Sequence, residues 1–183
     1  MTFGELLATV IGILDRSDIP YMITGSLASS YHGEPRATRD ADIVIAPEVA
    51  AIEPLVGGLL AAGFYVDRDV ALAAMTAQTQ FNAIGPDAMK VDFMMRRDRP
   101  FSMEEFSRRQ PADLLGTPGF VATAEDIILA KLEWAKATGS DRQLDDVAGI
   151  LAIASELDLE YVERWARVLG VDHAWQTIRD AGG

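Results

Sequence analysis

The chain has 183 residues, 49% of them hydrophobic, which suits one domain, or one domain with a small appended bundle, and argues against disorder. A formal net charge of -12 disfavours extended contact with nucleic acid, and the absence of cysteine excludes disulfides and thiol chemistry. No apolar stretch reaches the roughly 18–20 residues of a membrane span and no basic segment leads into an apolar one, so we expect a soluble, cytoplasmic protein without a membrane partner.

The first part of the chain alternates between helical and extended patterns. Apolar residues at helical spacing predict an amphipathic first helix, and Gly25-Ser26 turns the chain from a strand into a short helix. The predicted helices are residues 3–14, residues 27–31 and about 15 residues that start at Pro47, the favoured first position of a helix. The predicted strands are residues 21–24, 40–45 and 64–66.

Two further extended runs, residues 79–84 and 89–95, flank a turn-rich segment and predict a hairpin in a mixed sheet. Beyond residue 100 only residues 120–122 look extended, and Thr123 and Gly139 fit the start and end of a long helix. The predicted helices there are residues 103–109, 124–138, 143–154, 160–169 and 172–180.

The predicted fold class is therefore α/β (α+β), with a small mixed β-sheet core flanked by helices and a C-terminal helical subdomain. The segment 110–119, rich in proline and glycine, is the best candidate boundary. We expect a core over residues 1–110 and a helical subdomain over residues 111–183, packed on the core.

Asp40 and Asp42 are the most informative residues. Side chains two apart on a strand point to the same face, so both carboxylates face one point. No lysine interleaves them, and two adjacent anions repel unless they are compensated. Oxygen ligands suit magnesium or manganese, and a chain with no cysteine and only two histidines does not favour zinc.

The order of these motifs resembles the DNA polymerase beta-like nucleotidyltransferase superfamily. Its signature is Gly-Ser, then an Asp-x-Asp strand, then a third aspartate on a neighbouring strand, and the matches here are Gly25-Ser26, Asp40-Ala41-Asp42 and Asp92. Within the superfamily, the run Arg-Ala-Thr-Arg-Asp-Ala-Asp at 36–42 is most similar to small antibiotic nucleotidyltransferases and to nucleotidyltransferase toxins of bacterial toxin-antitoxin systems.

The resemblance implies an enzyme that transfers a nucleoside monophosphate from an NTP, such as ATP, to a hydroxyl, with pyrophosphate leaving. Asp40, Asp42 and Asp92 would hold Mg²⁺ or Mn²⁺ and so stabilise the attacking and the leaving oxygen. Asp92 would also help to remove the acceptor proton. A carboxylate in the middle of an apolar strand is costly to bury unless it is ligated, which agrees with that role.

Gly25 and Ser26 are the predicted phosphate-binding residues, because glycine allows close backbone approach and a helix N-terminus favours anions. The resemblance also implies that Lys131 would contact the triphosphate, and Arg39 is a weaker substrate-site candidate. Lys131 could instead be a solvated surface lysine, and Asp145 and Asp146 a solvated helix face. Five arginines could form a local anion-binding wall or merely balance acidic groups: Arg96, Arg97, Arg99, Arg108 and Arg109.

The acceptor is left open between a small molecule, an RNA end and a protein, and the acidic charge favours a small molecule or a protein. One alternative is a toxin that acts on tRNA or protein under the control of an antitoxin. Another is a non-catalytic nucleotide-binding or interaction module of the same fold. A homodimer partner is a further expectation.

Overall fold

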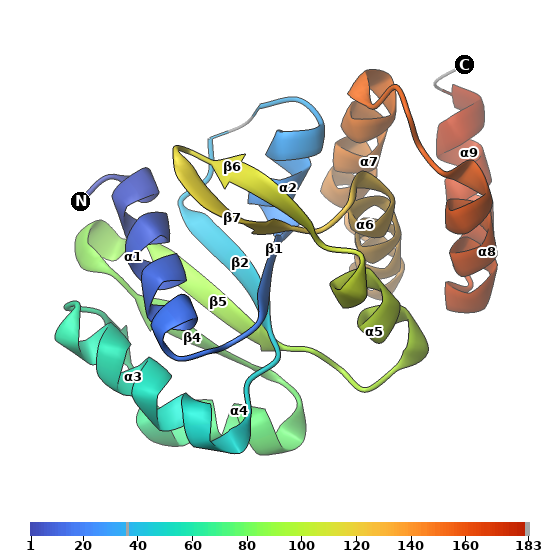
Figure 1. The fold of residues 1–183 in the computed structure, drawn as a ribbon. Helices are drawn as coiled ribbons and strands as arrows, with labels where there is room; N and C mark the ends of the chain where they lie inside the picture. The colour runs from blue at the N-terminus through green and yellow to red at the C-terminus, as the bar shows by residue number, and fades with distance from the viewer. Residues whose placement is uncertain (36, 182–183) are drawn as a thin grey trace.

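The computed structural model describes residues 1–35 and 37–181, and the strands among them form one seven-stranded mixed sheet (Figure 1). Strands β2 and β5 are parallel, as are β1 and β7, while the other neighbours are antiparallel. The sheet order is β3-β4-β5-β2-β1-β7-β6. The strands are β1 Tyr21–Thr24, β2 Asp40–Ile45, β3 Tyr65–Val66, β4 Gln80–Ile84, β5 Lys90–Met95, β6 Gln110–Leu114 and β7 Thr117–Val121. The predicted mixed sheet and its β4–β5 hairpin are confirmed.

Helices cover the sheet and extend beyond it. Helix α1 packs against α3. Its Leu6 side chain lies next to Gly85, and its Ile11 side chain lies next to Gly119 of β7. Figure 1 shows α6, α7, α8 and α9 gathered as a bundle at one side of the sheet. The helices are α1 Phe3–Arg16, α2 Gly25–His32, α3 Ile52–Ala61, α4 Arg68–Ala77, α5 Pro100–Ser107, α6 Ala124–Thr138, α7 Asp141–Ile153, α8 Leu159–Leu169 and α9 Asp172–Ala181.

The helix predicted to start at Pro47 starts later. A 3-10 turn at Val49–Ala51 precedes α3, whose first residue is Ile52. Pro54 explains the difference, since proline fits the first turn of a helix but not its interior. Helix α4, to which the sequence analysis assigned nothing, begins where the side chain of Asp67 accepts hydrogen bonds from two backbone N–H groups.

The predicted boundary segment 110–119 is a β-hairpin of the sheet. Residues Leu115 and Gly116 at its turn both have positive φ, as a tight two-residue hairpin turn requires. Proline is tolerated there because β6 is an edge strand and β7 meets β1 only near Val121. The all-helical part of the chain thus begins at Ala124, and the division into two domains stays a prediction.

The two faces of the central strands differ. Alternate residues of β2, β4 and β5 are buried in the core, including Ile43, Phe81 and Phe93. The other residues are half-buried or exposed and form what we call the open face: Asp40, Asp42, Val44, Gln80, Asn82, Ile84, Lys90, Asp92 and Met94. Among the described residues, no helix has both the length and the apolar character needed to cross a bilayer.

A network of charges joins α5, α6 and α8. The Asp126 carboxylate is fully buried and accepts hydrogen bonds from Tyr161 Oη at 2.5 Å and Thr123 Oγ1 at 2.6 Å. Arg108 donates to it at 3.2 Å while its guanidinium lies 3.8 Å from the centre of the Tyr161 ring. Burial raises the pKa of the nearby half-buried Glu105 to about 8, and the charge of Asp126 adds to the shift.

This network predicts a pH-dependent stability. The pKa of Glu105 in the folded chain lies above its ordinary value of 4.5, so the folded state binds the proton more tightly and stability falls as pH rises from about 4.5 to 8. In Glu105→Gln this dependence is lost. As pH rises from 5 to 8, we expect the free energy of unfolding of the variant to increase by about 1–3 kcal/mol relative to that of wild type, measured by urea titration.

The exposed Glu156 provides the control, because Glu156→Gln removes the same charge outside the network. A difference between Glu105→Gln and wild type that stays constant from pH 5 to pH 8 would contradict the prediction.

Candidate active site

The open face brings the three predicted carboxylates onto two adjacent strands. Strands β2 and β5 run parallel in a register that sets Asp42 beside Asp92 and Asp40 beside Lys90. Neighbouring strands lie about 4.8 Å apart, so the Asp42 and Asp92 side chains leave the sheet side by side. The equivalent positions on the other neighbours of these strands are Thr24 of β1, opposite Asp42, and Asn82 of β4, opposite Asp92.

Gly25 lets helix α2 begin directly against Asp42. It has φ +61°, and a Cβ atom added there would overlap the Asp42 carboxylate and lie only 2.7 Å from the Asp42 Cβ. The next residue, Ser26, donates its backbone N–H to the Asp42 side chain. The sequence predicted a turn here, but Gly25 and Ser26 are the first residues of α2 itself. The glycine therefore makes room for a carboxylate at the start of a helix.

The ionisation of Asp42 is perturbed by its surroundings in the site. Burial and the neighbouring charge of Asp92 raise its pKa, and Asp40 adds to the shift. The Ser26 N–H and the Lys90 ammonium act in the opposite direction. Asp40 is exposed at the first position of β2. The pair Asp42 and Asp92 is thus held close together at a cost in free energy.

Lys90 is a residue of the candidate site that the sequence analysis missed. Its Nζ lies 2.7 Å from Asp92 Oδ2, although no lysine interleaves the aspartates along β2. The compensating charge comes instead from the neighbouring strand. The available signal was the spacing Lys90 to Asp92, which places both side chains on one face of β5.

The donor chemistry of the open face suits a hard divalent cation. Asp42 and Asp92 offer carboxylate oxygens on one face and are repelled by each other, a situation that a cation relieves. Within residues 1–35 and 37–181 no group of three or more His, Cys, Asp or Glu side chains has the spacing of a metal site. Of the three predicted ligands, the structure therefore pairs Asp42 with Asp92, whereas Asp40 is exposed two residues along the same face and stands beside Lys90, and the predicted Mg²⁺ or Mn²⁺ stays a prediction.

Comparisons with solved structures identify the architecture. The crystal structure of ANT(2'')-Ia in complex with adenylyl-2''-tobramycin has a TM-score of 0.65 at 16% sequence identity, covering 94% of this chain and 99% of that chain. An antigenic nucleotidyltransferase-like protein from Paracoccidioides brasiliensis has a TM-score of 0.60 at 17% identity, covering 96% and 91%. The chain has the nucleotidyltransferase fold.

A third structure of this fold, the lincomycin-bound lincosamide antibiotic adenylyltransferase LnuA, has a TM-score of 0.56 at 9% identity and covers 82% of this chain and 97% of that chain. No family model matches the chain, and no curated protein matches its sequence. The resemblance predicted from the sequence is therefore confirmed at the level of the nucleotidyltransferase fold.

Lys131 lies in the helical part of the nucleotidyltransferase fold and is 5% exposed, so the interpretation as a solvated surface lysine is wrong. Its Nζ donates to Asp146 Oδ2 at 2.6 Å and to Gln143 Oε1 at 3.1 Å, which ties α6 to α7. The interpretation of Asp146 as part of a solvated helix face is wrong for the same reason. The predicted contact of Lys131 with a triphosphate stays a prediction.

The arginine candidates have different surroundings. Arg39 is exposed, one residue before β2, and its carbonyl oxygen accepts from the Lys90 N–H at 3.3 Å. Arg36 of the predicted motif lies outside the described residues. Arg99 pairs with Glu133 at 2.6 Å, and Arg108 pairs with Glu125 at 3.3 Å as well as with Asp126. These two arginines balance carboxylates, as one of the two interpretations expected.

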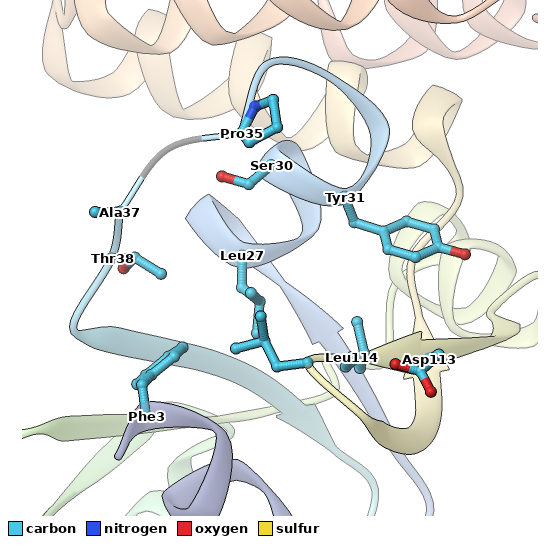
Figure 2. Close-up of a pocket in the computed structure, with 10 residues that line it drawn as sticks. Phe3, Leu27, Ser30, Tyr31, Pro35, Ala37, Thr38, Asp113 and Leu114 are labelled. Atoms are coloured by element: carbon cyan, nitrogen blue, oxygen red, sulfur yellow. The ribbon is translucent and has the colours of Figure 1, made fainter.

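A cavity of about 440 Å³ lies between α1, α2 and β6 (Figure 2). Figure 2 shows Phe3 of α1, Leu27 of α2 and Leu114 of β6 converging on it, with Asp113 at its edge. The Asp113 carboxylate accepts the Gly116 N–H at 2.7 Å and so belongs to the hairpin turn. Its described lining contains none of the three aspartates, and we assign the chemistry to the open face.

The contact between Gly25 and Asp42 predicts the effect of Gly25→Ala. The added methyl would displace the Asp42 carboxylate and strain a residue with positive φ, so we expect a loss of about 3 kcal/mol in the free energy of unfolding, measured by urea titration.

Gly139→Ala is the matched control, since Gly139 has φ +69° and a Cβ there meets no atom within 4 Å. It isolates the backbone strain, for which we expect a loss of about 1 kcal/mol. Equal losses in the two variants would show that Asp42 does not occupy the space beside Gly25.

Proposed function

We propose that the protein is a nucleotidyltransferase that depends on a divalent cation and transfers the nucleoside monophosphate of an NTP to a hydroxyl group, with release of pyrophosphate. The observation that carries the proposal is the pairing of Asp42 with Asp92 on adjacent parallel strands, beside Gly25 and Ser26. The nucleotidyltransferase fold of the chain supports it.

The energetics of the pair support a functional role. Asp42 and Asp92 stand at paired positions of adjacent strands, and burial together with the charge of Asp92 raises the pKa of Asp42. Asparagine could occupy either position and keep a hydrogen-bonding side chain without the repulsion. Perturbed ionisation occurs in structural networks such as that of Glu105 and Asp126 and also at sites of chemistry, and Asp42 differs from the former in facing a second carboxylate at the start of a helix.

Each residue has a role in the proposed reaction. Asp42 and Asp92, with Asp40, would hold Mg²⁺ or Mn²⁺, which when bound supplies charge stabilisation to the reacting phosphate. Ser26 and the N–H groups at the start of α2 would bind phosphate oxygens, as helix N-termini do. The acceptor oxygen forms a bond to the α-phosphorus, the bond from this phosphorus to the bridging oxygen breaks, and pyrophosphate leaves with the electron pair. Asp92 is the proposed acceptor of the hydroxyl proton.

The candidates Lys131 and Arg39 are given separate roles in the proposal. We assign Lys131 to positioning, because its ion pair with Asp146 joins α6 to α7, and both helices contact α2. The pair thereby supports the helix that carries Ser26. Arg39 lies next to Asp40 at the entrance to β2 and is the proposed exposed cation for the nucleotide.

The proposed acceptor is a small hydroxylated molecule. One structure of this fold holds adenylyl-2''-tobramycin and another holds lincomycin, so the architecture accommodates acceptors of that size. The net charge of -12 also favours a small molecule over a long nucleic acid. The alternatives of a toxin that modifies tRNA or protein under an antitoxin, and of a non-catalytic nucleotide-binding module, stay predictions, as does a homodimer.

The proposal predicts opposite effects of Asp42→Asn on binding and on stability. We expect magnesium-dependent NTP binding, measured by calorimetry with ATP, GTP, CTP and UTP, to fall at least about tenfold as a cation ligand is lost. We expect the free energy of unfolding at pH 8 to rise by about 1 kcal/mol, because the ionised Asp42 carboxylate is disfavoured in the fold and the amide removes that charge.

Asp40→Asn is the control for stability, since Asp40 is exposed and its replacement should leave the free energy of unfolding nearly unchanged. Transfer is tested with an α-³²P-labelled NTP, an aminoglycoside or lincosamide acceptor and, in parallel, total tRNA. If wild type bound none of the four NTPs with magnesium, the non-catalytic module would replace the present proposal. Label on tRNA alone would favour the toxin.

A further inference from the structure

Lys90 is the cation of the open face. Its ammonium lies 2.7 Å from Asp92 Oδ2, and in the β2–β5 register it stands opposite Asp40. Its side chain is 37% exposed, whereas that of Asp92 is 14% exposed. The ammonium therefore approaches a nearly buried carboxylate from the solvent side.

All three carboxylates act on Lys90. Its pKa is raised by the hydrogen bond and charge of Asp92, and the charges of Asp40 and Asp42 add to the shift. Conversely, Lys90 lowers the pKa of Asp42. The ammonium thus lies within the combined negative charge of the three carboxylates, to which a divalent cation would also be attracted.

Asp92 already holds the Lys90 ammonium, so a divalent cation bound by Asp92 would compete with it. Lys90 would have to move away from Asp92 for the carboxylate to serve as a metal ligand. The lysine side chain has a flexible four-carbon stem and is partly exposed, so its ammonium can turn toward solvent. A triphosphate bound beside Ser26 would offer the displaced ammonium a new anionic partner.

We propose that Lys90 couples metal binding to nucleotide binding: it neutralises Asp92 in the free protein, gives way to the divalent cation, and then pairs with the triphosphate. The second half of this inference rests on the proposed function. Cation and nucleotide therefore each bind weakly alone and strengthen each other by one common factor, because coupling free energies are reciprocal.

The test is a binding measurement that needs no turnover. Mn²⁺ affinity is measured by electron paramagnetic resonance, first alone and then with saturating α,β-methylene ATP, or the analogue of whichever NTP binds best. In Lys90→Gln we expect Mn²⁺ alone to bind about tenfold more tightly than in wild type, since the competing charge is gone. We expect the factor by which the nucleotide strengthens Mn²⁺ binding to fall about tenfold toward one.

Two variants serve as controls. Lys136→Gln removes the same charge, but Lys136 donates to the Leu169 carbonyl oxygen at 3.1 Å, away from the open face, so we expect wild-type values. Lys90→Arg keeps the cation and should bind Mn²⁺ alone nearly as weakly as wild type. Thermal unfolding of each variant checks that it is folded, and if Lys90→Gln does not fold, Lys90→Met takes its place.

Unchanged or weaker Mn²⁺ binding in folded Lys90→Gln would overturn the inference, as would an unchanged coupling factor in a variant that binds nucleotide. A different result would contradict the proposed function itself, namely that wild type binds no nucleotide with any cation. In that case the Mn²⁺ affinity of Lys90→Gln alone still decides whether Lys90 is the competing counter-ion.

Discussion

The repulsion between Asp42 and Asp92 is the constraint on which the rest of the site depends. Parallel pairing of β2 and β5 sets the two carboxylates side by side, and burial keeps water from screening them fully. The surrounding structure reduces the repulsion without removing it, through the Ser26 N–H on one side and the Lys90 ammonium on the other. The result is a pair of carboxylates whose repulsion the divalent cation of the proposed function would relieve.

The helical part of the chain holds α2, which carries Ser26, in place beside Asp42. Helix α2 contacts β2 as well as α6 and α7, and the buried ion pair of Lys131 with Asp146 joins those two helices. On the other side of α6, the fully buried Asp126 connects α5 and α8 through Arg108 and Tyr161. These buried charges face oppositely charged or hydrogen-bonding partners, whereas Asp42 and Asp92 also face each other, with the Ser26 N–H and the Lys90 ammonium as their partners.

Much of the fold could be predicted from the sequence where local preferences decide it. The strands 21–24 and 40–45 and the helix 124–138 appear at the predicted positions, and Thr123 and Gly139 cap that helix as expected. The β6–β7 hairpin was missed because Pro111, Pro118 and Gly119 resemble a linker. Only its place at the edge of the sheet makes those residues acceptable in strands.

The sequence by itself determined the alternation that puts Asp40 and Asp42 on one face, the glycine that permits a sharp strand-to-helix transition, and the lack of soft metal ligands, because these depend on neighbours in the chain. Only the tertiary structure decided that β5 lies parallel to β2, that Lys90 neutralises Asp92, and that Lys131 is buried against Asp146. Those features depend on contacts between distant segments. Such contacts are selected by the packing of the whole core rather than by local conformational preference.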